Sequence, residues 1–101
     1  MSYIYIWQFK VMAGKEKEFE RAYGPEGDWV QLFRQSKGYL RTILVRTIAD
    51  ANTYLTIDEW ISSADFLTFK KQFHDEYYTL DSRFSGLTTD EMQIGEFESV
   101  K

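Results

Sequence analysis

The sequence contains no cysteine and only one histidine. Without cysteine, the chain cannot form disulfides, thiolate metal sites, iron–sulfur clusters or a cysteine nucleophile. One histidine among scattered carboxylates is no cluster of metal ligands, so no metal site is expected. The lack of cysteine also fits a reducing compartment, and we expect a cytoplasmic protein.

Long runs of apolar residues and long runs of one charge are also missing. No stretch approaches the roughly 18 apolar residues of a membrane span. The N-terminal residues lack the charged start, apolar stretch and cleavage site of a signal peptide. The net charge of −4 comes from 12 basic and 16 acidic residues, without the basic face that nucleic acids or acidic membranes need. Neither a nucleic acid nor a membrane is therefore an expected partner.

Aromatic residues, by contrast, make up 18% of the 101 residues. This length is typical of one domain, so we expect a single domain over residues 1–101. Aromatic side chains bury large areas, and a chain this short has few places for them. A core, an interface and a ring-lined pocket must therefore share them.

The periodicity of apolar residues predicts the order of the secondary-structure elements. Strands are expected over residues 3–11, 39–48, 53–60 and 91–100. Helices are expected over residues 15–23, from Asp28 to before Gly38, and from Ser62 or Ser63 to about Asp81. A loop follows over residues 81–90, and Gly95 is typical of a bulge. This order predicts an α+β, ferredoxin-like β-α-β-β-α-β fold with both helices on one face of a four-stranded antiparallel sheet.

The strands at residues 3–11 and 39–48 carry bulky apolar residues on both faces. Tyr5, Trp7 and Ile43 are expected to lie under the helices. The opposite face then holds Ile4, Ile6, Leu40 and Leu44. Because exposed apolar faces usually mark interfaces and symmetric dimers are the commonest assembly, we expect a homodimer that packs sheet against sheet. Such an interface would bury about 2,000 Å² or more.

Four segments carry a resemblance to a known family, and they span about residues 5–97. The aromatic first strand ends in Val11-Met12-Ala13-Gly14, and Glu59-Trp60-Ile61-Ser62-Ser63 closes the third strand. Between them, Tyr-Gly-Pro-Glu-Gly-Asp-Trp at 23–29 leads to Ser-Lys-Gly-Tyr-Leu at 36–40. In this order and spacing the chain resembles the antibiotic biosynthesis monooxygenase-type domain of the dimeric α+β barrel group.

The resemblance implies several chemistries. Some members of this family are oxygenases without metal, flavin or haem, in which an electron-rich phenol or quinol itself reduces oxygen. Others degrade haem, with Asn on the first strand and Trp and His on the long helix. Those positions hold Trp7, Phe69 and Thr79 here, so haem degradation is disfavoured. Quinol-oxygenase relatives often carry His on the long helix, at the positions of Phe69 and His74, and only the second is kept here.

His74 is the candidate catalytic base, because an imidazole titrates near neutral pH and can take the proton of a phenol. The candidate substrate-binding residues are aromatic: Tyr5, Trp7, Trp60 and Phe69 as walls, with Tyr77 or Tyr78 as a hydrogen-bond donor. Each has an ordinary structural alternative, since such rings commonly fill a core and a flank histidine commonly pairs with an acid.

Two functions are therefore expected from the sequence. The first is a cofactor-independent monooxygenase acting on a small aromatic or quinol-type substrate in a pocket between sheet and helices. The second is a non-catalytic dimeric domain of the same fold that binds a small ligand or regulates. The position of His74 separates them: a His74 that faces a cavity lined by Trp7 and Phe69 favours the first, and a solvent-facing His74 favours the second.

Overall fold

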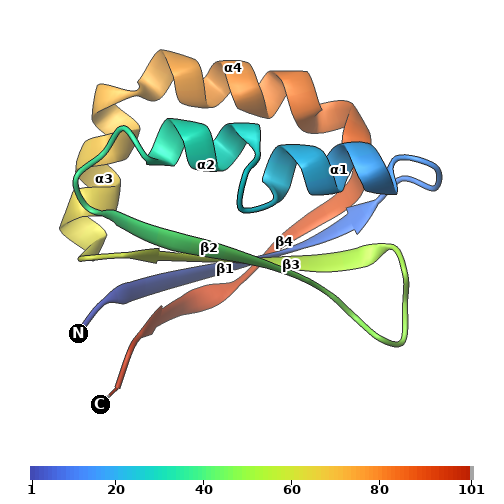
Figure 1. Cartoon of the computed structure of the whole chain (residues 1–101), viewed down its shortest axis with the longest axis horizontal. Coiled ribbons are helices and arrows are strands. Elements are labelled where there is room, and N and C mark those ends of the chain that lie inside the picture. The colour runs from blue at the N-terminus through green and yellow to red at the C-terminus, as the bar shows by residue number, and fades with distance from the viewer. Residues whose placement is uncertain (101) are drawn as a thin grey trace.

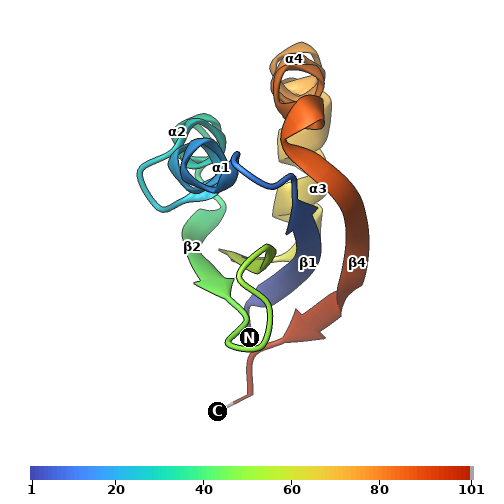
Figure 2. The same cartoon turned by 90° about the vertical axis from the view of Figure 1, so that its right-hand side faces the viewer.

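A four-stranded antiparallel sheet carries all the helices on one of its faces (Figures 1 and 2). The structure is a computed structural model that describes residues 1–100. The strands are β1 (Tyr3–Val11), β2 (Tyr39–Arg46), β3 (Thr53–Trp60) and β4 (Thr88–Glu98), in the order β2-β3-β1-β4. The helices are α1 (Glu16–Tyr23), α2 (Asp28–Phe33), α3 (Ser63–Gln72), α4 (His74–Phe84) and the short 3₁₀ turn η1 (Ser85–Leu87). The predicted ferredoxin-like α+β fold is confirmed.

The long helix expected from Ser62 or Ser63 to Asp81 is two helices. Phe73 leaves helical geometry, with φ −110° and ψ 32°, and separates α3 from α4. Figure 1 shows the two segments running in different directions. The apolar stripe survives the break, since Phe66 and Phe69 are buried on α3 and Leu80 is buried on α4. No helix among residues 1–100 is long and apolar enough to cross a membrane.

The loop predicted at residues 81–90 is mostly regular structure. Helix α4 continues to Phe84, and strand β4 already begins at Thr88. The bulge suggested by Gly95 is confirmed, because the register between β1 and β4 shifts there: Ile6 pairs with Gly95, but Trp7 pairs with Gln93.

The predicted faces of β2 were wrong. A register shift between Tyr39 and Arg41 reverses the alternation along the strand. Leu44 therefore packs against the helix-covered core, whereas Ile43 lies on the open face and is partly exposed. A second apolar face still exists, but its β2 members are Ile43 and Val45.

Aromatic rings fill the space between the sheet and the helices. Trp60 at the end of β3 has no exposed surface, and its ring centroid lies 5.5 Å from that of Phe33 and 5.1 Å from that of Phe69. At the other end of the sheet, Phe9 and Phe19 are packed at 5.3 Å. Part of the region between these clusters is a cavity rather than solid core.

Candidate functional site

The cavity has a volume of about 110 Å³ and lies between the middle of the sheet and helices α1, α2 and α4. Its walls are largely aromatic, with a few polar side chains from the sheet and acidic residues from α4 and β4. The lining residues are Trp7, Phe9, Tyr23, Trp29, Val30, Phe33, Thr42, Thr56, Asp58, Asp81 and Glu91. Its size is on the scale of one aromatic ring, since a cavity of about 150 Å³ can bind benzene.

Asp58 is the buried acid of this cavity. Alternation along the inner strand β3 turns Asp58 to the same side as Trp60, toward the helices, and leaves it only 8% exposed. Burial raises the pKa of Asp58 to about 6, and the hydrogen bond from Thr42 opposes that rise. The carboxyl group therefore changes its protonation state near neutral pH.

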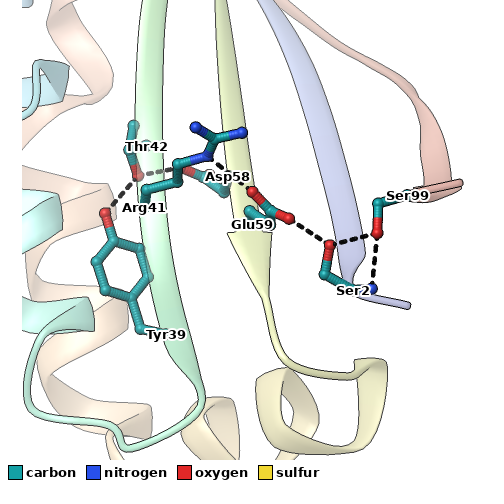
Figure 3. Close-up of polar contacts among 7 residues, drawn as sticks. All are labelled: Ser2, Tyr39, Arg41, Thr42, Asp58, Glu59 and Ser99. Carbon is teal, nitrogen blue, oxygen red and sulfur yellow. Dashed lines mark hydrogen bonds and ion pairs between the residues drawn. The ribbon is translucent and has the colours of Figure 1, made fainter. Parts of the chain in front are cut away.

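One oxygen of Asp58 is held by a chain of hydroxyl groups (Figure 3). The Tyr39 hydroxyl donates to Thr42 Oγ1 at 2.8 Å, and Thr42 Oγ1 donates to Asp58 Oδ1 at 2.6 Å. Among residues 1–100, no group donates a hydrogen bond to the other oxygen, Oδ2. Asp58 therefore keeps one free acceptor in a cavity-lining position.

The next residue, Glu59, shows how alternation separates two acids (Figure 3). Glu59 points to the open face, where Arg41 Nε donates to its Oε1 at 2.8 Å and the Ser2 hydroxyl donates to its Oε2. These donors lower the pKa of Glu59. Asp58 has its pKa raised by burial and lines the cavity; Glu59 has its pKa lowered and lies outside it.

Trp29 and Tyr23 form one part of the cavity wall. The Trp29 side chain is 7% exposed, and its indole Nε1 has no open surface. The Tyr23 hydroxyl is the polar group beside this N–H: burial raises the pKa of Tyr23, and a hydrogen bond from Trp29 opposes that rise. The site therefore combines a titratable acceptor with an otherwise neutral aromatic wall.

The acidic side chains of the cavity are not arranged as a set of metal ligands. Over residues 1–100, no three His, Asp or Glu side chains lie close enough together to ligate one ion. The acids of the cavity are thus dispersed around its wall rather than gathered at a point.

A comparison with protein families decides the relationship. The family model for antibiotic biosynthesis monooxygenases matches residues 2–74. The chain belongs to this family. No curated protein matches the chain in a sequence comparison.

Solved structures agree with this antibiotic biosynthesis monooxygenase fold. A variant of SnoaB, a cofactor-independent oxygenase from Streptomyces nogalater, aligns with a TM-score of 0.81 at 20% identity, over 99% of this chain and 94% of that chain. A Bordetella bronchiseptica protein, provisionally assigned as an antibiotic biosynthesis monooxygenase, aligns with a TM-score of 0.76 at 15% identity, over 99% and 98%. At these identities the similarity establishes the fold alone.

Of the wall residues predicted from the sequence, only Trp7 lines the cavity. Tyr5 lies two residues before Trp7 on β1, and its ring packs edge-on against the Trp7 ring, with 6.0 Å between the ring centroids. Trp60 and Phe69 are packed into the core. Tyr77 lies behind the wall, with its ring 5.0 Å from that of Trp29.

His74 lies away from the cavity. Its side chain is 65% exposed at the start of α4, with Nδ1 3.3 Å from a carboxylate oxygen of Asp75 and its ring 4.6 Å from that of Tyr78. Tyr78 is itself 55% exposed. The geometry therefore does not bring His74 or Tyr78 to Trp7, and their catalytic and binding roles stay predictions from the sequence.

Sequence reasoning missed Asp58, Thr42 and Trp29. A signal for Asp58 was present, because the strand at 53–60 ends in an inward-facing Trp60 and alternation then turns Asp58 inward as well. Thr42 was hidden by the reversed face of β2. The place of Trp29 in the cavity wall is a property of the packed structure and has no counterpart in the sequence pattern.

Proposed function

We propose that this chain is a cofactor-independent monooxygenase that acts on a small aromatic, quinol-type substrate in the cavity between sheet and helices. The observation that carries the proposal is Asp58, a buried carboxyl group with a pKa of about 6 and one free oxygen, in a cavity walled by aromatic rings. Membership of the antibiotic biosynthesis monooxygenase family supports the reaction class. The similar fold of SnoaB, a cofactor-independent oxygenase, supports the same class.

Asp58 is the proposed base. A phenol becomes a good electron donor to oxygen once it loses its proton, and a base with a pKa near the working pH accepts that proton efficiently. The largely aromatic walls of the cavity limit the contact of the resulting phenolate with water.

The reaction balances without another reductant. A hydroquinone and O₂ give a hydroxyquinone and water: one oxygen atom enters the ring, the other leaves as water, and the ring supplies all four electrons. The cavity volume of about 110 Å³ favours single-ring substrates over fused-ring ones.

Oxygen uptake by metal-stripped protein tests the proposal. We expect stoichiometric uptake with at least one substituted hydroquinone, and slower uptake with anthrone-like phenols, whose three rings exceed the cavity. Isotopic labelling with ¹⁸O₂ should place one labelled atom in the product. Uptake that is absent for every substrate, or that stops on metal removal, would contradict the proposal.

Replacing Thr42 with valine should move the acidic limb of the kcat/KM profile to higher pH, by about one unit. The Thr42 hydroxyl stabilises ionised Asp58 at 2.6 Å, and a hydrogen bond to a charged group contributes about 1.5 kcal/mol. Thr42→Ser keeps the donor and is the matched control, with an unchanged profile. An unshifted profile in Thr42→Val would remove Asp58 as the titrating group.

The second candidate function is a non-catalytic ligand-binding domain, and the exposure of His74 is the observation in its favour. The oxygen uptake of variants distinguishes the candidate bases and the candidate functions. If Asp58 is the base, His74→Ala should change oxygen uptake by less than about twofold, whereas a role as base predicts a loss of about a hundredfold. Ligand binding without uptake in the unmodified protein would identify the binding domain.

We further propose that the chain forms a homodimer through the open face of its sheet. Ile43, Ile57 and Ile6 pair across β2, β3 and β1, and Ile6 pairs with Gly95 of β4. The Phe97 ring lies over Gly95, with Cζ 3.0 Å from the place where a Cβ would stand, which is closer than ordinary van der Waals contact. An apolar row therefore crosses all four strands, and such a face is typical of an interface.

The cytoplasmic location expected from the cysteine-free sequence also stays a prediction.

A further inference from the structure

The charge of the cavity has one sign. Asp58 is the buried acid in its wall, and Asp81 from α4 and Glu91 from β4 are exposed side chains that also line it. None of its lining residues is Lys, Arg or His. A negatively charged ligand would meet like charge without a compensating partner.

The basic side chains near the cavity interact with other groups. Arg83, on the same helix as Asp81, lies with Nη1 3.5 Å from Oδ2 of Asp28. Lys70 has its ammonium 4.9 Å from the centre of the Tyr77 ring. Neither side chain therefore neutralises the acids of the cavity.

The aromatic walls act in the same direction as the acids. The face of a tryptophan ring carries partial negative charge and attracts cations within about 6 Å. Trp7 and Trp29 both line the cavity. A positively charged group beside an aromatic ligand would therefore be attracted by both acids and rings, and a carboxylate would be repelled by both.

The free oxygen of Asp58 can accept a hydrogen bond from a ligand. Among residues 1–100 only Thr42 donates to this carboxyl group, and it donates to Oδ1, which leaves Oδ2 open in a side chain that is 8% exposed. A phenol hydroxyl offers a donor, so it can satisfy Oδ2. This geometry is an observation independent of the charges of Asp81 and Glu91.

We propose that the cavity selects single-ring phenols by charge: it rejects phenols that carry a carboxylate and prefers those that carry an ammonium group on a short side chain. The ring and hydroxyl enter toward Asp58, and the ammonium group stays near Asp81 and Glu91. The inference rests on the proposed use of this cavity as the substrate site, but its test does not require oxidation.

Three phenols with nearly the same shape provide the test: tyramine, tyrosol and 4-hydroxyphenylacetate, which carry a positive, no and a negative charge at about pH 8. Binding is measured by calorimetry without oxygen, so that turnover does not interfere, and is checked by quenching of tryptophan fluorescence. We expect tyramine to bind at least about tenfold more tightly than 4-hydroxyphenylacetate, with tyrosol between them. Equal affinities, tighter binding of 4-hydroxyphenylacetate, or no binding of any of the three would overturn the inference.

Paired variants locate the selectivity. Asp81→Asn with Glu91→Gln should bring the affinities for tyramine and tyrosol together, and Asp75→Asn is the matched control because Asp75 lies on the same helix but does not line the cavity. An unchanged preference in the double variant would overturn the assignment to these acids. If the three phenols bind in the expected order but no quinol supports oxygen uptake, the charge selection stands and the proposed oxygenase activity is rejected. If oxygen is taken up but the three phenols bind equally, the oxygenase activity stands and the charge selection is rejected.

Discussion

Replacing Asp58 with asparagine is expected to lower kcat for oxygen uptake by about a hundredfold or more, because the base is lost and the shape of the side chain is kept. The asparagine carbonyl oxygen can still accept from the Thr42 hydroxyl. Binding of the quinol should therefore change far less than turnover. The measurement is oxygen consumption at saturating substrate, with anaerobic binding measured in parallel.

The same variant should be more stable than the wild type above neutral pH. Burial raises the pKa of Asp58 from 3.8 to about 6, so ionisation of Asp58 opposes folding. Below pH 3.8 the group is protonated in folded and unfolded chains alike. As the pH rises from about 3.8 to about 6, the wild type loses up to about 3 kcal/mol of unfolding free energy that the asparagine variant retains. Urea unfolding at several pH values measures this difference.

Glu59→Gln is the matched control for Asp58→Asn, since it neutralises the adjacent acid on the opposite face of the sheet. Its carboxylate accepts from Arg41 and Ser2 and does not line the cavity. Oxygen uptake should be unchanged in this control. A normal rate in Asp58→Asn, together with its expected gain in stability, would exclude Asp58 as the base although the variant folds.

The fold could be predicted because its signals are local and repeated. Aromatic alternation defined β1, and the spacing of Phe66, Phe69 and Leu80 defined the buried side of α3 and α4. Which residues of β2 face the helices could not be predicted, because the register between β2 and β3 shifts between Tyr39 and Arg41 and reverses the alternation. Which residue adopts that irregularity depends on pairing with β3, about 20 residues away along the chain.

The candidate base His74 was predicted from residue type, and the proposed base Asp58 was chosen from its burial. Histidine titrates near neutral pH by its own chemistry, so His74 was the natural candidate. Burial can bring a carboxyl group into the same range, as it does for Asp58. Burial depends on the whole packed core, whereas His74 follows the break at Phe73 and lies at the exposed start of a new helix.

Placing a charge at the centre of the open sheet face should separate the proposed dimer. Ile57 pairs with Ile43 on one side and Ile6 on the other, so Ile57→Asp puts a carboxylate in the middle of the apolar row. Two-fold symmetry brings two such charges into one interface. Burying unpaired charges costs several kcal/mol, so the dissociation constant should rise by about a thousandfold or more.

The control is Ile48→Asp, which makes the same chemical change at a fully exposed residue in the connection between β2 and β3. Light scattering at micromolar concentration should give a dimer mass for the wild type and Ile48→Asp, and a monomer mass for Ile57→Asp. Circular dichroism should be alike for all three, because Ile57 lies on the face away from the helices and the core. A monomeric wild type, or a dimer that survives Ile57→Asp, would mean that this face is not the contact between copies. The cavity lies on the other side of the sheet, so a folded Ile57→Asp monomer also shows whether dimerisation is needed for oxygen uptake.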